Sequence, residues 1–227
     1  MTSLRVRQKA GRRRDILAAA GELFRRDGFD RTSIEGIAER AAVAPGTVYN
    51  YFRSKGDLLL ALVALDGEEI RADGKRLIAR PPADPVAAVN RLLEGYVDHA
   101  LVYLDKRLWR NIMATALTQA ATPFGQGYAE LDGKLARQVA DLLAALQDRG
   151  RLPTTLRCDD AGQILFAVCN THFMTFVAQD DMPLAAMKEA MFRHIRMVFE
   201  GLIAPAGTAT PERKRPQADE RREPLAT

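Results

Sequence analysis

The sequence predicts an all-α protein of about nine helices, and three observations support this fold class. Apolar residues recur at intervals of three and four along most of the 227 residues, which is the period of a helix with one buried face. Capping residues, glycines and prolines divide this pattern into segments of helical length. Hydrophobic residues make up 47% of the chain, so we expect a packed core rather than disorder.

The first predicted helix spans about residues 12–27 and ends at Gly28, a residue that favours the left-handed turn after a helix. The preceding residues, 1–11, are polar and basic, and we expect them to be mobile. They are either a solvated tail or an arm that follows a phosphate backbone. The helix has one apolar face, formed by Ile16, Leu17, Ala20, Leu23 and Phe24.

Two short helices joined by a tight turn are predicted next. Thr32 and Glu35 have the spacing of a capping box at the start of the first one. The second begins with a proline, which suits a position where the amide hydrogen is not needed. Val48 and Phe52 are four residues apart and are expected to face inward, so small and polar residues face outward. Two such helices suit insertion of the second into a DNA major groove. The outward residues are Pro45, Gly46, Thr47, Asn50 and Tyr51.

A fourth helix begins where Ser54 and Asp57 repeat the capping-box spacing. It is rich in leucine but contains Gly67 and Gly74, each of which lowers helix propensity by about 1 kcal/mol relative to alanine. These glycines are either tolerated on a surface or form weak points at which the helix pivots. Five more helices are predicted after the Pro81-Pro82 pair, at about residues 84–104, 105–121, 127–149, 159–178 and 183–202.

The helix at about residues 159–178 is apolar on nearly every face, so it must be buried all round. A bundle of this size leaves most helices with one wet side, so we expect a second subunit to cover the remaining face. We predict that the last two helices pair with their symmetry mates in a four-helix homodimer interface. A monomer with an unusually apolar core is the alternative. The expected interface residues are Ile164, Val168, Met187, Met191, Ile195 and Val198.

Charge is distributed unevenly along the chain. Residues 1–56 carry 12 Lys/Arg against 6 Asp/Glu, whereas residues 57–204 carry 16 against 19. A basic segment that coincides with the helix-turn-helix pattern favours contact with phosphates. The Pro-, Arg- and Glu-rich residues 205–227 have almost no large apolar side chain and are expected to be disordered.

Several function classes have weak support in the sequence. Two cysteines, Cys158 and Cys169, without a short-spaced framework fit a reducing cytoplasm. Residues 1–14 lack the apolar core of a signal peptide, and no apolar run reaches the length of a membrane span. Cys169 and His172 share a helical face, but no third ligand is evident, so no metal site is expected. We expect neither a cofactor nor catalytic residues, because no nucleophile-and-base pairing or phosphate-binding glycine loop occurs.

The stretch from about residue 13 to residue 62 resembles the DNA-binding domain of the tetracycline-repressor (TetR) family of bacterial regulators. The matching features are the Gly28-Phe29 pair, the TSI and IA segments, the PGTVYNYF run and the SK pair. They cover roughly a quarter of the chain. Two residues depart from the family pattern, which usually has a turn glycine at Ala42 and often a serine at Ala44. Alanine costs about 1 kcal/mol if position 42 needs a positive φ, and Ala44 cannot cap the second helix by its side chain.

The resemblance implies a role for each matching residue of the DNA-binding segment. Thr32 is expected to bind a phosphate, and Lys55 to grip the DNA backbone. Tyr49 and Tyr51 are expected to flank the groove. Base edges are expected to face Pro45, Gly46, Thr47 and Asn50.

The resemblance further implies three segments and a regulatory function. The segments are residues 1–56, an arm and helix-turn-helix domain, residues 57–204, an effector-binding and dimerisation domain, and the tail 205–227. We predict a cytoplasmic repressor that binds a pseudo-palindromic operator as a homodimer and is released by a small molecule. An activator or an effector-independent regulator of the same fold is the alternative, and an enzyme is less favoured. Candidate ligand-binding residues are Tyr96, His99, Tyr103, Trp109, Met113, Phe166, Asn170, His172 and Phe173.

Overall fold

The computed structural model describes residues 2–203, which form nine helices and no strand. The predicted all-α fold is confirmed, with a helix-turn-helix at the amino end and a helical bundle behind it. The helices are α1 (Thr2–Asp27), α2 (Ile34–Arg40), α3 (Pro45–Tyr49), α4 (Lys55–Ala79), α5 (Pro85–Tyr103), α6 (Lys106–Thr118), α7 (Pro123–Asp148), α8 (Cys158–Ala178) and α9 (Leu184–Ile203).

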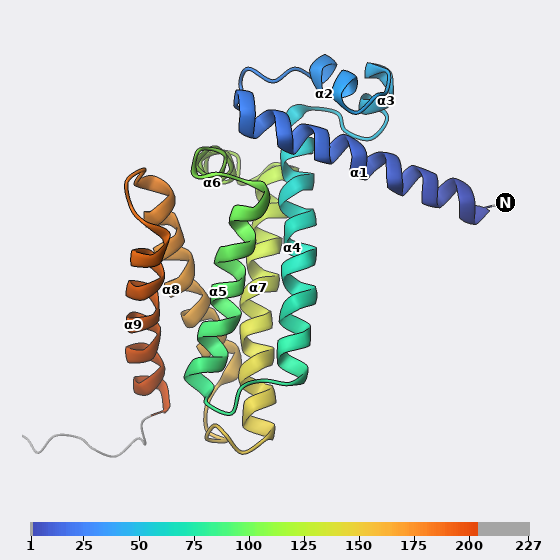
Figure 1. The fold of residues 1–227 in the computed structure, drawn as a ribbon. Helices are drawn as coiled ribbons and strands as arrows, with labels where there is room; N and C mark the ends of the chain where they lie inside the picture. Colours follow the sequence, from blue (N-terminus) through green and yellow to red (C-terminus); the bar gives the residue numbers. More distant parts are fainter. Residues whose placement is uncertain (1, 204–227) are drawn as a thin grey trace, which may run out of the picture.

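The head of the molecule consists of α1, α2 and α3 (Figure 1). Its core is made by fully buried side chains, including Leu17 and Phe24 from α1, Ile37 from α2 and Val48 from α3. The helix α1 is longer than predicted, because it begins at Thr2 instead of near residue 12. No proline interrupts these first residues, and their arginines, lysine, leucine and glutamine are good helix formers. The structure thus places residues 2–11 in α1, where no helix was predicted, and Figure 1 shows this end of α1 extending away from the rest of the molecule.

Side-chain caps explain where several helices begin. Ser33, and not Thr32, is the N-cap of α2, because its hydroxyl accepts a hydrogen bond from the amide of Gly36 at 3.0 Å. The predicted cap of α4 is confirmed, since the Ser54 hydroxyl accepts from the amide of Asp57 at 3.1 Å. Thr122 caps α7, which begins at Pro123, four residues earlier than predicted. A proline at the first helical position starts a helix as readily as it stops the preceding one.

The bundle is organised around α4 and α7. The helix α4 runs from the head along the bundle (Figure 1) and packs against α5 and α7, while α8 packs between α7 and α9. By length and composition α8 is also apolar enough to cross a membrane, the one such helix in residues 2–203. Its buried residues, among them Leu165 and Phe173, belong to the same core as those of α7, which is the arrangement of a core helix.

The inner face of α9 corrects part of the predicted dimer interface. Met187, Met191 and Ile195 are at most 2% exposed and pack into the core of their own subunit. Their spacing of four residues marks the face toward α5 and α8, not a surface that a second subunit can reach. On α8, Ile164 is 43% exposed. The predicted tail, 205–227, lies outside the described residues.

Candidate nucleic-acid interface and internal cavity

The turn between α2 and α3 sets the direction of α3, whose Val48 packs into the core of the head. Ala42 has a φ of +54°, so the backbone at this position is in the left-handed conformation that favours glycine. An L-residue pays about 1 kcal/mol there. Ala44 precedes α3 without a side-chain cap, so the amino end of α3 is bare. The turn therefore contains backbone strain at Ala42, and the side chain of Ala44 does not cap the first amide groups of α3.

The outward face of α3 is small and polar. Pro45, Gly46 and Asn50 are exposed, and no atom lies within 4 Å of the place where a Cβ of Gly46 would stand. Tyr49 is 51% exposed, whereas Tyr51 is half-buried against the core. About half of the Tyr49 ring is therefore open to solvent, and packing within the chain does not require a glycine at position 46.

Two expected phosphate contacts have internal partners instead. The side chain of Thr32 is 4% exposed, and its hydroxyl donates to the carbonyl oxygen of Gly28 at 2.8 Å. The Lys55 ammonium group donates to the carbonyl oxygens of Phe29 and Asp30 at 2.8 and 3.1 Å and lies over the Phe29 ring. Both side chains join the end of α1 to the elements after it. Lys55 in particular attaches the first residue of α4 to the loop before α2.

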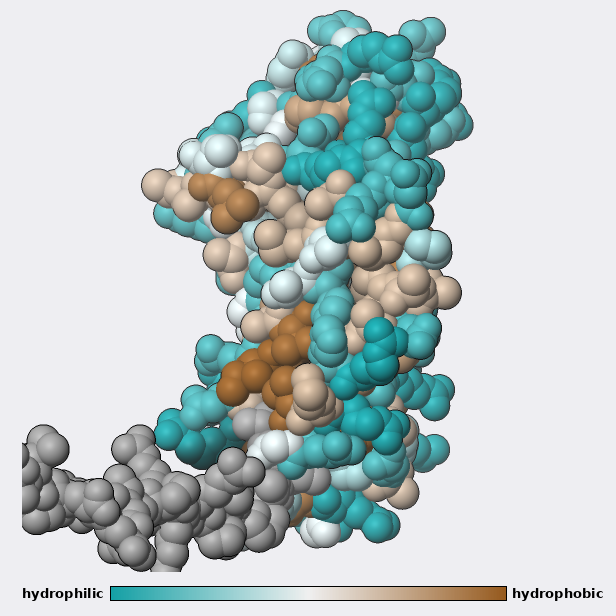
Figure 2. All heavy atoms as spheres, turned by 90° about the vertical axis from the view of Figure 1, so that its left-hand side faces the viewer, coloured by the Kyte–Doolittle hydropathy of each residue, from teal (hydrophilic) through white to brown (hydrophobic). Residues whose placement is uncertain are grey.

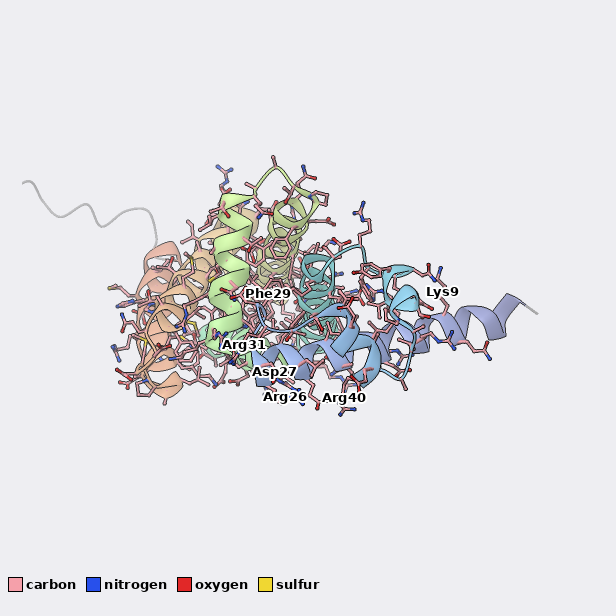
Figure 3. The ribbon with its side chains drawn as sticks, turned by 90° about the horizontal axis from the view of Figure 1, so that it is seen from above. Lys9, Arg26, Asp27, Phe29, Arg31 and Arg40 are labelled. Carbon is pink, nitrogen blue, oxygen red and sulfur yellow. The ribbon has the colours of Figure 1, made fainter. Side chains whose placement is uncertain are left out.

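Exposed basic side chains surround the head. Seen from above in Figure 3, Arg26, Arg31 and Arg40 lie on the α1–α2 side, while Lys9 lies further along α1. Arg40 pairs with Glu22 at 2.7 Å, and more than half of its side chain is exposed. Ion pairs this exposed are weak and are screened by salt, so they leave the cations available to a phosphate backbone.

The bundle encloses a cavity of about 60 Å3. It lies between α4, α5, α6, α7 and α8, and its walls are mainly aromatic and aliphatic. Its lining residues are Ile70, Tyr96, Val97, Ala100, Trp109, Tyr128, Leu131, Asp132, Leu135, Phe166, Cys169, Asn170 and Phe173.

The structure distributes the candidate ligand-binding residues over several places. Five of them line the cavity, namely Tyr96, Trp109, Phe166, Asn170 and Phe173. His99 lies in a separate surface groove between α4 and α5. Met113 packs against the core, and the side chain of Tyr103 lies outside the described part of the chain.

His172 is corrected, because it does not face the cavity. Its Nε2 lies 2.9 Å from Nδ1 of His194 on α9, at the surface between the two helices. Burial, together with the neighbouring His194, lowers the pKa of His172 below its usual value. The residue is polar because it meets another imidazole, and not because it meets a ligand inside the bundle.

Sequence reasoning missed Asp132 and Tyr128, which both line the cavity. Asp132 follows Tyr128 by four residues, so the two share a face of α7 within its apolar stripe. A carboxylate in such a stripe is the signal that would have identified the residue. Burial raises the pKa of Asp132 to about 6.

A hydrogen-bonded relay joins the cavity wall to α4. The Tyr96 hydroxyl donates to Oε1 of Gln138 at 2.9 Å, and Nε2 of Gln138 donates to the carbonyl oxygen of Arg71 at 2.8 Å. Gln138 is 5% exposed. A buried amide that loses a hydrogen-bond partner costs about 1–3 kcal/mol. If Tyr96 moves, Gln138 is therefore expected to move with it and to shift the backbone of α4 at Arg71.

Comparison with known proteins agrees with this architecture. Residues 16–62 match the family model described as bacterial regulatory proteins, tetR family. The chain is 40% identical over 73 residues to the HTH-type transcriptional repressor KstR of Rhodococcus jostii. It is 28% identical over 201 residues to the HTH-type transcriptional regulator EthR of Mycolicibacterium smegmatis, covering 86% of this chain and 88% of that one.

A solved structure extends the similarity over most of the chain. The crystal structure of Thermus thermophilus FadR, a TetR-family transcriptional repressor in complex with lauroyl-CoA, has a TM-score of 0.61 and 25% identity. The match covers 87% of this chain and 98% of that one. The match to the Rhodococcus repressor, by contrast, spans 34% of that protein, and a match to the Escherichia coli regulator UidR spans 39%. The family model thus matches residues 16–62, and the matches to these two relatives span less than two fifths of each relative.

Proposed function

This chain belongs to the tetR family of bacterial regulatory proteins, and we propose that it is a cytoplasmic, ligand-responsive repressor. It binds a pseudo-palindromic operator as a homodimer and leaves it when a small molecule enters the bundle. The observation that carries the proposal is the outward face of α3. Gly46 has open space around it, and Tyr49 is a large apolar side chain that is 51% exposed. An external surface that the fold itself does not need fits a DNA groove.

Direct readout follows from the residue types on α3. The Asn50 amide can donate to and accept from an adenine edge, and Thr47 offers a hydroxyl and a methyl group to thymine. Gly46 permits close approach of the helix to the bases. We assign Tyr49, more than the half-buried Tyr51, to the rim of the groove. Thr32 and Lys55 position α2 and α4 through their internal hydrogen bonds, so phosphate contacts fall to the exposed arginines.

The surface of α8 and α9 supports a dimer. Ile164 and Met174 on α8 are each 43% exposed, and Met197 on α9 is 65% exposed. Figure 2 faces this side of the molecule and shows apolar surface gathered on its lower half. Val168 and Val198 are half-buried beside it. Val168, Val198 and Ile164 therefore remain in the proposed interface. The three buried residues of α9 lie beneath this patch, namely Met187, Met191 and Ile195.

The contacts of α4 support a route by which a ligand would release DNA. The helix is attached to the head through Lys55 and to the cavity wall through the Tyr96–Gln138–Arg71 relay. A ligand that fits better when the wall is displaced favours a second position of α4, and thereby a spacing of the two heads that does not match the operator. Effector and operator then weaken each other's binding by the same factor.

Selection from a random pool of DNA duplexes tests the proposed function. We expect a palindrome whose half-sites lie about 34–36 Å apart, so that two copies of α3 enter successive major grooves. Affinity for the selected duplex should fall steeply with salt, because several phosphates are neutralised. Recovery of unrelated sequences, or of a single half-site, would contradict the proposal.

A further inference from the structure

The chemistry of the cavity wall narrows the kind of molecule that it accepts. Five aromatic side chains face the cavity, from Tyr96, Trp109, Tyr128, Phe166 and Phe173. Trp109 and Phe173 meet edge to face with ring centroids 5.3 Å apart, and Trp109 Nε1 donates to the carbonyl oxygen of Ala100 at 2.7 Å. These rings are therefore held in fixed orientations. Aromatic walls attract apolar groups, and their faces also attract cations.

Asp132 is the one acidic residue among the lining residues of this cavity. Asn170 donates a long hydrogen bond of 3.5 Å to its Oδ2. Within the described part of the chain, no lysine, arginine or histidine lies within ion-pair distance of its carboxyl group. Its other titratable neighbours are the Tyr128 hydroxyl and the Cys169 thiol, whose pKa values are raised by burial and by the negative charge of Asp132.

Two cations lie near Asp132 on α7, and each is paired with another carboxylate. Arg137, one turn further along α7, pairs with Asp159 at 2.8 Å, and Lys134 pairs with Glu130. Near neutral pH, a half-buried carboxyl group with a pKa of about 6 is mostly ionised. Asp132 thus presents a negative charge to an aromatic cavity whose lining residues include no lysine, arginine or histidine.

Asp132 lies at the boundary between the cavity and a groove on the protein surface. Together with Phe166 it lines both the cavity and a surface groove of about 420 Å3 between α7 and α8. An elongated molecule can place a ring or alkyl group in the cavity, a positive charge at Asp132 and its remaining part in the groove. The groove is large enough for such a part, whereas the cavity alone holds only a small group.

We propose that the effector is an amphipathic organic cation, whose positive charge pairs with Asp132 while its apolar part displaces Phe166 and Leu131 to enter the aromatic cavity. This inference rests on the proposed function and specifies its ligand class. Both displaced side chains are half-buried. Leu131 lies where a Cβ of Gly67 would stand, so its displacement presses on α4. Entry of the cation and movement of α4 are then one event.

Binding of rhodamine 6G, a lipophilic cation, to the full chain at pH 7.5 tests the ligand class by fluorescence anisotropy. Two anions serve as probes of opposite charge. Fluorescein, which is of similar size, is followed by its own anisotropy, and lauroyl-CoA by its ability to displace a bound dye. We expect rhodamine 6G to bind at least tenfold more tightly than either. Asp132→Asn should reduce that affinity at least tenfold. Asp141→Asn, which removes an exposed carboxylate of α7 that lines neither the cavity nor the groove, should change it less than twofold. Equal binding to both variants, or preference for an anion, would overturn the proposal.

The pH profile of the wild type gives a second readout that needs no variant. Between pH 7.5 and pH 5 the ionised fraction of Asp132 falls from nearly all to about one tenth, so rhodamine 6G affinity should fall about tenfold. Fluorescein is left out of this series, because the dye itself titrates. In Asp132→Asn the profile should be flat, and a flat profile in the wild type would overturn the role of Asp132.

Release of a selected operator duplex separates this inference from the proposed function. Displacement of the protein from DNA by rhodamine 6G supports both. Tight cation binding without release supports the ligand-binding site and contradicts its regulatory role. Release by lauroyl-CoA but not by rhodamine 6G supports the ligand-responsive repressor and overturns the cationic ligand class.

Discussion

The outward face of α3 and the seam between α4 and α7 use glycine in opposite ways. At Gly46 on α3, an added Cβ would meet nothing within 4 Å. At Gly67 and Gly74 on α4, an added Cβ would overlap Leu131 and Gln138 of α7. The first glycine leaves space on the outside of the protein, while the other two let a neighbouring helix fill the space completely.

This difference distinguishes residues whose type is explained by a binding partner from residues whose type is explained by packing within the chain. Side chains along the α4–α7 seam are fixed by contacts within the chain, and Gln138 even satisfies groups on two other helices. Side chains on α3 have few such contacts, so stability does not explain them. Substitutions at the two kinds of site should therefore affect different measurements.

The largest expected effect is on DNA binding at Gly46. Gly46→Ala adds one methyl group to the face proposed to meet the bases, and we expect at least a tenfold loss of affinity for a selected operator in an anisotropy titration. Unfolding should be unchanged or shifted by less than about 1 kcal/mol toward stability, because alanine favours a helix. Gly95→Ala is the matched control, because Gly95 on α5 also has open space around it. Similar operator affinity for both variants would refute the role of α3.

The next effect is on stability at Gly74. Gly74→Ala forces Gln138 from its place between Tyr96 and Arg71, and overpacking of this kind costs about 1–3 kcal/mol. The gain in helix propensity of about 1 kcal/mol offsets part of that cost. We expect a net loss of about 1–2 kcal/mol in urea denaturation, whereas Gly95→Ala should stabilise the protein. Equal stability of the two variants would show that α4 and α7 accommodate the added methyl group without displacing Gln138.

Asp132 should show an effect of the opposite sign. Its pKa is about 6 in the folded protein and 3.8 as a free side chain, so the folded state binds more protons between these values. The free energy of unfolding therefore falls as pH rises from 4 to 6, by less than about 3 kcal/mol. Asp132→Asn should remove this slope and raise the melting temperature at pH 7.5. A lower melting temperature would mean that the carboxylate stabilises the fold.

The smallest effect is expected in the turn that presents α3. Ala42→Gly removes the strain of a positive φ, about 1 kcal/mol, but adds freedom to the unfolded chain, about 0.4–1 kcal/mol. Thermal unfolding should therefore show a gain of at most a few tenths of a kcal/mol. A clear loss would indicate that the methyl group of Ala42 makes a contact of its own.

The sequence predicts the fold well where the signal is local. Helix positions follow from apolar periodicity and from caps such as Ser54 and Asp105, and the inward Val48 and Phe52 follow from their spacing. The cavity is harder to predict, because it joins five helices that are distant in the sequence. Periodicity identifies a buried stripe on α9 but does not say whether it faces its own subunit or another. For that reason Met191 was expected at an interface and lies in the core.

The central claim is that α3 reads base edges in the major groove, and methylation interference on a selected operator tests it most directly. Methylation at guanine N7 modifies the major groove, whereas methylation at adenine N3 modifies the minor groove. If α3 lies in the major groove, methyl groups at guanine N7 in both half-sites should prevent binding of the wild-type protein. Interference confined to adenine N3, or absent from both grooves, would contradict it.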